Sequence, residues 1–305
     1  MPIRYRQKEE EELRKKLAIM GNSYEIEHPE RLATVLNLTT LLQEQGRYGT
    51  ARKMLQVLIE DLKKVGRENG VEIMEVHQNL ARVLIRQGFY NIAEKLSKQA
   101  FQFMQDTLGK DHPKTLHAMC ALADAYYAQD RLQEAESLRK EHLEACNKVF
   151  PAGHIFTIGS TMTLATIYGK QGRLEEAEWL KVRVIELLKN NHGGDNILAV
   201  TATTNLAVTL CKQGKLEDAE RLQLQTLERS RRLLGEEHPD TLLLMANLAC
   251  LYKDQGRESE AVGLMGKVVQ LRCRILGSQH PQTVSAEERL RSWKATREMN
   301  ISPIY

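Results

Sequence analysis

The segment HPDTLLLMANLACLYKDQGRESEA, which runs from His238 to Ala261, decides the fold because related copies of it recur every 42 residues. Three positions hold the same residue in six successive copies. They are a leucine (Leu38, Leu80, Leu122, Leu164, Leu206, Leu248), a glutamine (Gln45, Gln87, Gln129, Gln171, Gln213, Gln255) and an alanine (Ala51, Ala93, Ala135, Ala177, Ala219, Ala261). A constant period of this kind is the signature of a repeat protein, in which each unit packs on its neighbours.

Each copy reads as two helices joined by a tight turn. The first, helix A, has proline at its expected first position in several copies, where the missing amide hydrogen costs nothing; these are Pro29, Pro113, Pro239 and Pro281. Glycine follows the glutamine in every copy but one, which has Asp130. Because glycine adopts a left-handed backbone conformation at low cost, we expect the chain to reverse there. The second, helix B, carries the alanine, whose small side chain allows close approach to helix A.

The repeats also set the expected domain boundaries. We expect six 42-residue units over residues 27–282, which together form one all-α solenoid of antiparallel helix pairs. Residues 1–26 are predicted to form an N-terminal capping helix, because a terminal unit of a solenoid needs a polar outer surface. Residues 283–297 are predicted to form a C-terminal capping helix, and residues 298–305 a flexible tail.

The composition argues against nucleic-acid and membrane partners. Of 305 residues, 42% are hydrophobic and 27% are charged, and the formal net charge is +3. No block of lysine and arginine concentrates this charge, whereas electrostatic binding to nucleic acid needs basic residues on one face. The N-terminal stretch is charged and lacks the apolar segment of a signal peptide or a membrane anchor. We therefore expect a cytoplasmic protein.

Neither the cysteines nor the repeated histidines predict a metal or a cofactor. Cys120, Cys146, Cys211, Cys250 and Cys273 include no CxxC pair, and this pattern favours reduced thiols in a cytoplasmic protein. The histidines that open the repeats stand at least 42 residues apart, one repeat or more, which is too far from each other to share a metal ion. A glycine-rich phosphate-binding loop is also absent from the sequence.

The pattern resembles the tetratricopeptide repeat. Leucine with tyrosine on the packed face of helix A, as in Leu164 with Tyr168 and Leu248 with Tyr252, matches that motif, although its usual period is about 34 residues. The 42-residue period, together with HPDTL, NLA, LY, QGR and EAE, is similar to the kinesin light chain type and to the tetratricopeptide tails of nucleotide-binding sensor proteins. The resemblance implies a right-handed superhelix. One departure is that Ser97, Arg139 and Lys181 stand where the motif has an aromatic residue.

The resemblance further implies a concave groove lined by helices A. The residue just before the invariant leucine would point into that groove, and these residues are Asn37, Asn79, Ala121, Thr163, Asn205 and Asn247. An amide both donates and accepts hydrogen bonds, so a row of asparagines suits recognition of a peptide main chain. The alternative is that each asparagine bonds a neighbouring helix or water.

Charged residues accompany this row in the second and third repeats. Positions four before and three after the groove position lie on the same stripe of helix A; here they are Glu75, Arg82, His117 and Asp124. One hypothesis makes His117 and Asp124 an acid–base pair, but a seven-residue spacing separates them by about 10 Å along the axis. A salt linkage among Arg82, Glu75 and Asp124 is the simpler interpretation, and we assign no catalytic residue.

The sequence therefore predicts an interaction scaffold or adaptor that holds an extended peptide or protein segment in the concave groove. The expected groove residues are Asn37, Glu75, Asn79, Arg82, His117, Asp124, Thr163, Asn205 and Asn247. Three alternatives stay open. The groove could be a pocket for a small molecule, for binding or for biosynthetic catalysis; the chain could be the sensor part of a nucleotide-binding receptor-like system; or it could self-associate through its terminal repeats.

Overall fold

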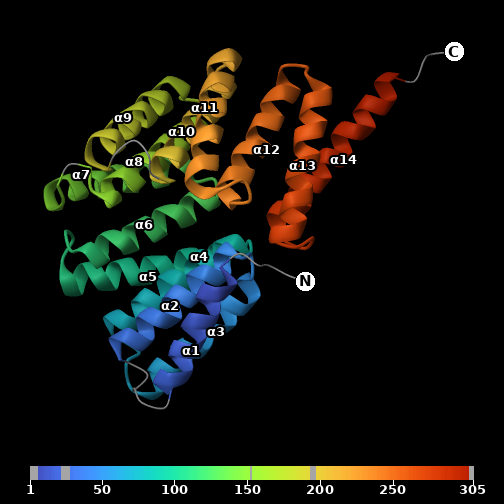
Figure 1. Cartoon of the computed structure of the whole chain (residues 1–305). Coiled ribbons are helices and arrows are strands. Elements are labelled where there is room, and N and C mark those ends of the chain that lie inside the picture. The colour runs from blue at the N-terminus through green and yellow to red at the C-terminus, as the bar shows by residue number, and fades with distance from the viewer. Residues whose placement is uncertain (1–5, 22–27, 152, 193–196, 302–305) are drawn as a thin grey trace. The chain divides into compact units, whose positions relative to one another are not determined.

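A computed structural model describes residues 6–21, 28–151, 153–192 and 197–301, and within these ranges it contains fourteen α-helices and no β-strand (Figure 1). The helices are α1 Gln7–Gly21, α2 Pro29–Glu44, α3 Tyr48–Lys64, α4 Val71–Arg86, α5 Tyr90–Leu108, α6 Pro113–Ala128, α7 Leu132–Val149, α8 Ile155–Lys170, α9 Leu174–His192, α10 Ile197–Lys212, α11 Leu216–Leu234, α12 Pro239–Asp254, α13 Glu258–Ile275 and α14 Pro281–Ile301. The even-numbered helices from α2 onward are helices A, and the odd-numbered helices from α3 onward are helices B. The expected all-α solenoid is confirmed.

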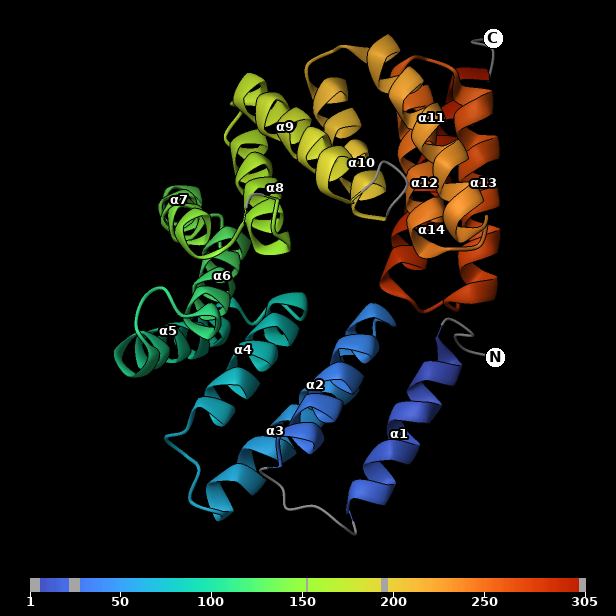
Figure 2. The same cartoon turned by 60° about the vertical axis from the view of Figure 1, so that its left-hand side comes forward.

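The helices form two compact units, Arg6–Ile167 and Tyr168–Tyr305, so that the boundary falls within α8. In the first unit, α2 to α7 pack in succession, and helix A of one repeat also contacts helix A of the next, as α4 does with α6 (Figure 2). The second unit follows the same scheme from α9 to α14, and there α10 contacts α12. The A-to-A contacts make helices A one continuous face in each unit.

The histidines that open the repeats are helix caps. The Nδ1 atom of each accepts a hydrogen bond from the backbone N–H two residues later, which satisfies one of the unpaired donors of the first turn. The N–H groups belong to Glu30 for His28 (3.3 Å), Lys114 for His112 (3.1 Å), Phe156 for His154 (3.3 Å), Asp240 for His238 (3.2 Å) and Gln282 for His280 (3.2 Å). This local role explains why a histidine recurs with the period of the repeat.

The turns between helices A and B confirm the predicted role of the glycines. All five glycines that follow the glutamine have positive φ, for example 72° at Gly46 and 81° at Gly172. Asp130 occupies the same place with φ 62°, which is unusual for a residue with a side chain. The invariant alanines of the helices B are completely buried in all six repeats, which agrees with the expected close approach to helix A. They act as spacers between the helices.

The invariant glutamine has a role that the period alone did not reveal. Gln129 Nε2 donates to Glu94 Oε2 at 2.7 Å, and Arg131 pairs with the same carboxylate at 2.8 Å, so the turn of one repeat is tied to helix B of the previous repeat. Gln213 and Gln255 make the same bond to Glu178 and Glu220. We call this the Gln-Glu-Arg link.

The two terminal helices extend the same packing. Glu10 of α1 accepts from Arg47 at 2.8 Å and from Gln45, as the helix B glutamate does in later repeats. Thus α1 packs on α2 in the manner of a helix B. The helix that begins at Pro281 continues to Ile301, four residues beyond the end expected at residue 297, and residues 302–305 lie outside the described residues.

Candidate functional site

A cavity of about 210 Å³ opens on the helix A face of the Arg6–Ile167 unit. It is lined by Glu75 and Gln78 of α4, by Pro113, Lys114 and His117 of α6, and by Phe156 of α8. Three successive helices A therefore contribute to one site, each through its N-terminal half. Glu75 and His117, two of the expected groove residues, meet here.

The imidazole of His117 is oriented by Gln78. The Nδ1 atom of His117 lies 2.7 Å from Oε1 of Gln78, which is almost fully buried. Because an amide oxygen only accepts, Nδ1 carries the proton and Nε2 keeps a free lone pair. Desolvation by the surrounding protein, together with the charge of Arg82, lowers the pKa of His117. The exposed ring is thus held neutral, with an acceptor for a ligand.

The rim of the cavity combines an ion pair with an aromatic wall. Lys114 Nζ and Glu75 Oε1 are 2.8 Å apart, and both side chains remain partly exposed. Phe156 packs edge-on against Phe150 and His154, with ring centroids 5.3 and 5.2 Å away. These contacts hold an exposed apolar ring beside charged groups. Sequence reasoning missed Phe156, although Ile155 and Phe156 replace the Pro-Asp or Pro-Lys of other repeats and could have signalled it.

Asn79 does not offer its amide to a ligand. Its Oδ1 accepts from Nη2 of Arg82, its Nδ2 donates to the backbone oxygen of Glu75 at 2.9 Å, and the residue is only 6% exposed. Both ends of the amide are therefore used within α4. At this position the alternative interpretation, in which the asparagine bonds its own helix, is the one that the structure supports.

The charged residues pair differently from the expected salt linkage. Asp124 forms an ion pair with Arg139 of α7, Glu75 pairs with Lys114, and Arg82 bonds Asn79. His117 and Asp124 thus have separate partners, and the two side chains do not form a hydrogen-bonded pair in the described part of the chain. The expected direct ion pairs among Arg82, Glu75 and Asp124 do not form, because Lys114 of α6 pairs with Glu75 and Arg139 of α7 pairs with Asp124. Arg82 and Asp124 still attract each other electrostatically.

The remaining groove residues are not among those that line the cavity. Asn37 is exposed on α2, and the Thr163 hydroxyl donates to the backbone oxygen of Gly159 at 3.0 Å. Asn205 and Asn247 are half-buried and belong to the Tyr168–Tyr305 unit. Lys181, which is buried, donates to the backbone oxygen of Asn205 at 3.0 Å.

A buried polar network lies behind Asp124. Arg139 donates to the Cys120 sulfur at 2.9 Å, His142 Nε2 lies 3.1 Å from the same sulfur, and His142 Nδ1 lies 2.9 Å from the Ser160 hydroxyl. Burial is the largest cause that lowers the pKa of His142, to about 4, and that raises the pKa of Cys146 to about 12. Within the described ranges, no three His, Cys, Asp or Glu side chains are arranged to hold a metal ion. Across the same ranges no helix is long and apolar enough to span a bilayer.

The sequence and the structure were compared with known protein families and solved structures. The family model described as tetratricopeptide repeat matches residues 72–148 and 198–274. The chain is similar to the structure of kinesin light chain TPR-like repeats from Podosopora anserina, with 25% identity and a TM-score of 0.56 over 66% of this chain and 95% of that one. No curated protein matches the sequence.

Two further structures share the fold at lower identity. One is the apo form of the quorum sensor NprR from B. thuringiensis, with 13% identity and a TM-score of 0.61 over 94% of this chain and 83% of that one. The other is NprR in complex with its cognate peptide NprX, with 17% identity and a TM-score of 0.60 over 98% and 84% of the two chains. On the sequence pattern, the helical pairs and these matches, the chain belongs to the tetratricopeptide repeat family, with repeats of the kinesin light chain type.

Proposed function

We propose that the chain is an interaction adaptor that holds an extended segment of a partner protein on the helix A face of the Arg6–Ile167 unit. The observation that carries the proposal is the cavity in which Glu75, His117 and Phe156 come together from three repeats. The NprR structure with its cognate peptide supports the idea that this fold is suited to peptide binding.

The chemistry of the cavity suits a peptide better than a metabolite. Its volume of about 210 Å³ is below the roughly 300–1,000 Å³ of pockets that enclose small molecules. Such a cavity accommodates one side chain, while the rest of the ligand runs along the face. His117 Nε2 and the Glu75 carboxylate accept hydrogen bonds, Lys114 donates them, and Phe156 contacts an apolar side chain. We infer a ligand with an apolar residue next to exposed main-chain groups.

We also propose that the protein acts in the cytoplasm. All five cysteines are free thiols. This includes Cys120 and Cys146, whose sulfur atoms are 3.1 and 3.5 Å from His142 Nε2. Free thiols in this number are typical of a reducing compartment. A fractionation experiment that finds the endogenous protein outside the cytoplasm would contradict this assignment.

Binding to an array of random short peptides tests the proposed peptide site. We expect Phe156→Ala and Lys114→Ala each to weaken the best peptides about tenfold, or ~1.4 kcal/mol. Lys95→Ala is the matched control, because Lys95 is an exposed lysine on helix B of the same unit. Circular dichroism checks that all variants keep their helix content. Equal binding by the wild type and both cavity variants would refute the assignment.

A further inference from the structure

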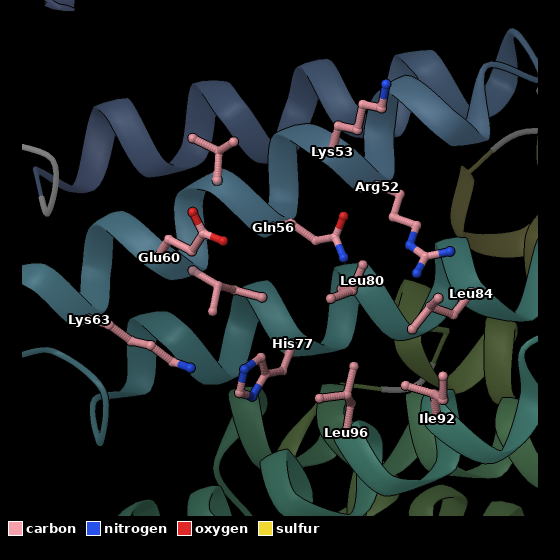
Figure 3. Close-up of a pocket in the computed structure, with 12 residues that line it drawn as sticks. Arg52, Lys53, Gln56, Glu60, Lys63, His77, Leu80, Leu84, Ile92 and Leu96 are labelled. Carbon is pink, nitrogen blue, oxygen red and sulfur yellow. The ribbon is translucent and has the colours of Figure 1, made fainter.

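A second and larger cavity, of about 650 Å³, lies on the other face of the same unit, between the helices B α3 and α5 (Figure 3). Leu80 and Leu84 of α4 and Leu96 of α5 form its apolar floor. Figure 3 shows Gln56 of α3 and His77 of α4 projecting toward the space between them. We call this cavity the outer groove. It shares no residue with the cavity on the helix A face.

Two exposed residues of the outer groove break the pattern of the repeat. Val57 is 55% exposed and Ile92 is 50% exposed. The later repeats have polar residues at the position of Val57, namely Gln99, Glu141, Arg183, Gln225 and Lys267. They have acidic residues at the position of Ile92, namely Glu134, Glu176, Asp218 and Glu260. Exposed apolar side chains therefore occur at this pair of positions only between the first and second repeats.

The Gln-Glu-Arg link is replaced at the same place. Arg52 stands where later repeats have the linking glutamate, and Phe89 stands where they have the linking arginine or lysine. Arg52 instead lies over the ring of Phe89, 5.0 Å from its centroid. Gln87 therefore has no glutamate at the place where Glu94 receives the Nε2 atom of Gln129, and its buried Oε1, like that of Gln213, has no hydrogen-bond partner within the described residues. Between the first and second repeats, the Gln-Glu-Arg link is therefore replaced by the contact of Arg52 with the partly exposed ring of Phe89.

This exchange indicates a surface that a partner covers. Single exposed apolar residues are common, but apolar residues that gather in one groove mark a binding surface. Phe89, which is 44% exposed, adds to the apolar surface of Val57 and Ile92. Arg52, Val57, Phe89 and Ile92 depart together from the repeat, and we attribute these four departures to binding rather than to packing within the unit.

The charge and length of the outer groove specify the chemistry of the partner. Arg52, Lys53 and Lys63 line it, against one acidic residue, Glu60. Within the described ranges none of these four side chains forms an ion pair with another residue of the chain. From Arg52 to Lys63 the groove extends eleven residues along α3, about 16 Å or three helical turns. His77 adds a buried Nδ1 without a hydrogen-bond partner in the described structure.

We propose that the outer groove binds a short amphipathic helix of a partner protein, with an apolar stripe on Val57 and Ile92 and flanking acidic residues toward Arg52, Lys53 and Lys63. A helix suits an elongated groove between two helices, because its side chains at i, i+3, i+4 and i+7 lie on one face and can fill the groove together. The acidic residues of the partner helix would pair with the three basic residues at the rim of the groove, which has a single acidic residue of its own. This site goes beyond the peptide site on the helix A face and is independent of it.

The chain itself provides the test variant. Arg52→Glu, Phe89→Arg and Ile92→Glu together install the residues of the later repeats. This triple variant restores the Gln-Glu-Arg link, so we expect it to fold and to unfold at higher urea concentration than the wild type. The probe is a display library of acidic amphipathic helices with varied apolar residues, beside a matched library with lysine in place of glutamate.

We expect the wild type to enrich the acidic library and the triple variant to lose at least about tenfold in affinity for the selected peptides. Val57→Gln alone should show part of this loss, and Phe156→Ala should show none. Higher salt should weaken binding. Equal enrichment of both libraries, or equal binding by the triple variant, would overturn the proposal. Dimerisation of the wild type that the triple variant abolishes would assign the groove to a second copy instead.

Discussion

Lowering the pH should destabilise the Arg6–Ile167 unit through one buried residue, His142. The ring is 1% exposed and lies between the Ser160 hydroxyl and the Cys120 sulfur. It fits these partners when neutral, with Nδ1–H donating to Ser160 and Nε2 accepting from the thiol. Burial, followed by the charge of Arg139, lowers its pKa to about 4.

The size of the effect follows from the two pKa values of this ring. In the unfolded chain the pKa of a histidine is about 6.5, so at pH 7.5 the ring is neutral in both states and contributes no pH dependence. At pH 5 the unfolded chain binds a proton that the folded chain excludes, which costs about 2 kcal/mol of stability. The loss reaches about 3 kcal/mol below pH 4, where both states are protonated.

Urea unfolding of the wild type and of His142→Gln, followed by circular dichroism at pH 7.5 and pH 5, measures this contribution. Other groups titrate alike in both proteins and cancel in the difference. We expect the stability difference between wild type and variant to change by about 2 kcal/mol in favour of the variant as the pH falls. A difference that is independent of pH would refute the reasoning, as would an NMR titration of the ring with a midpoint near 6.5.

Four other substitutions test the packing, each measured by urea unfolding at pH 7. Asp130→Gly should raise the stability by about 1 kcal/mol, because it relieves a left-handed conformation, whereas Gly172→Ala should lower it by a similar amount. Lys181→Met should raise the stability at pH 7, because burial lowers the pKa of this lysine to about 8 and disfavours its charge. That gain should vanish above about pH 10.5, where the lysine is neutral in both states. Ala219→Leu should cost roughly 1–3 kcal/mol by overpacking, and an unchanged midpoint would contradict the spacer role.

The fold could be predicted from the sequence because each invariant residue acts locally. A glycine or Asp130 after the glutamine sets φ within its own turn, and a proline sets the first turn of helix A. The alanine at the same position of every helix B indicates that each helix pair packs in the same way. The link from Gln129 to Glu94 could have been inferred from the same period, since both residues recur in register. Local and periodic causes are readable without coordinates.

The candidate site was only partly predictable, because its pairing depends on side chains from different helices. Helical spacing predicted that Glu75, Arg82, His117 and Asp124 share one region, and two of them, Glu75 and His117, line the same cavity. It did not reveal that Arg139 of α7 would reach Asp124, since Arg139 occupies a helix B position that other repeats fill with quite different residues. Spacing also cannot tell that Arg82 turns back to its own helix and engages Asn79. Competition among long side chains is a three-dimensional property.

A repeat protein supplies its own controls, which separate structural departures from functional ones. Arg139 and Lys181 both depart from the family motif, yet both are buried and bonded within the chain, so their departure is compensated internally. Val57 and Ile92 depart from their own repeats in the opposite way, because they gain apolar surface that stays exposed among the residues that the structure describes. A compensated change needs no partner, whereas an uncompensated exposed apolar patch is the kind of surface that a partner would bury. By this criterion the outer groove is a stronger marker of binding than any residue that the repeats hold in common.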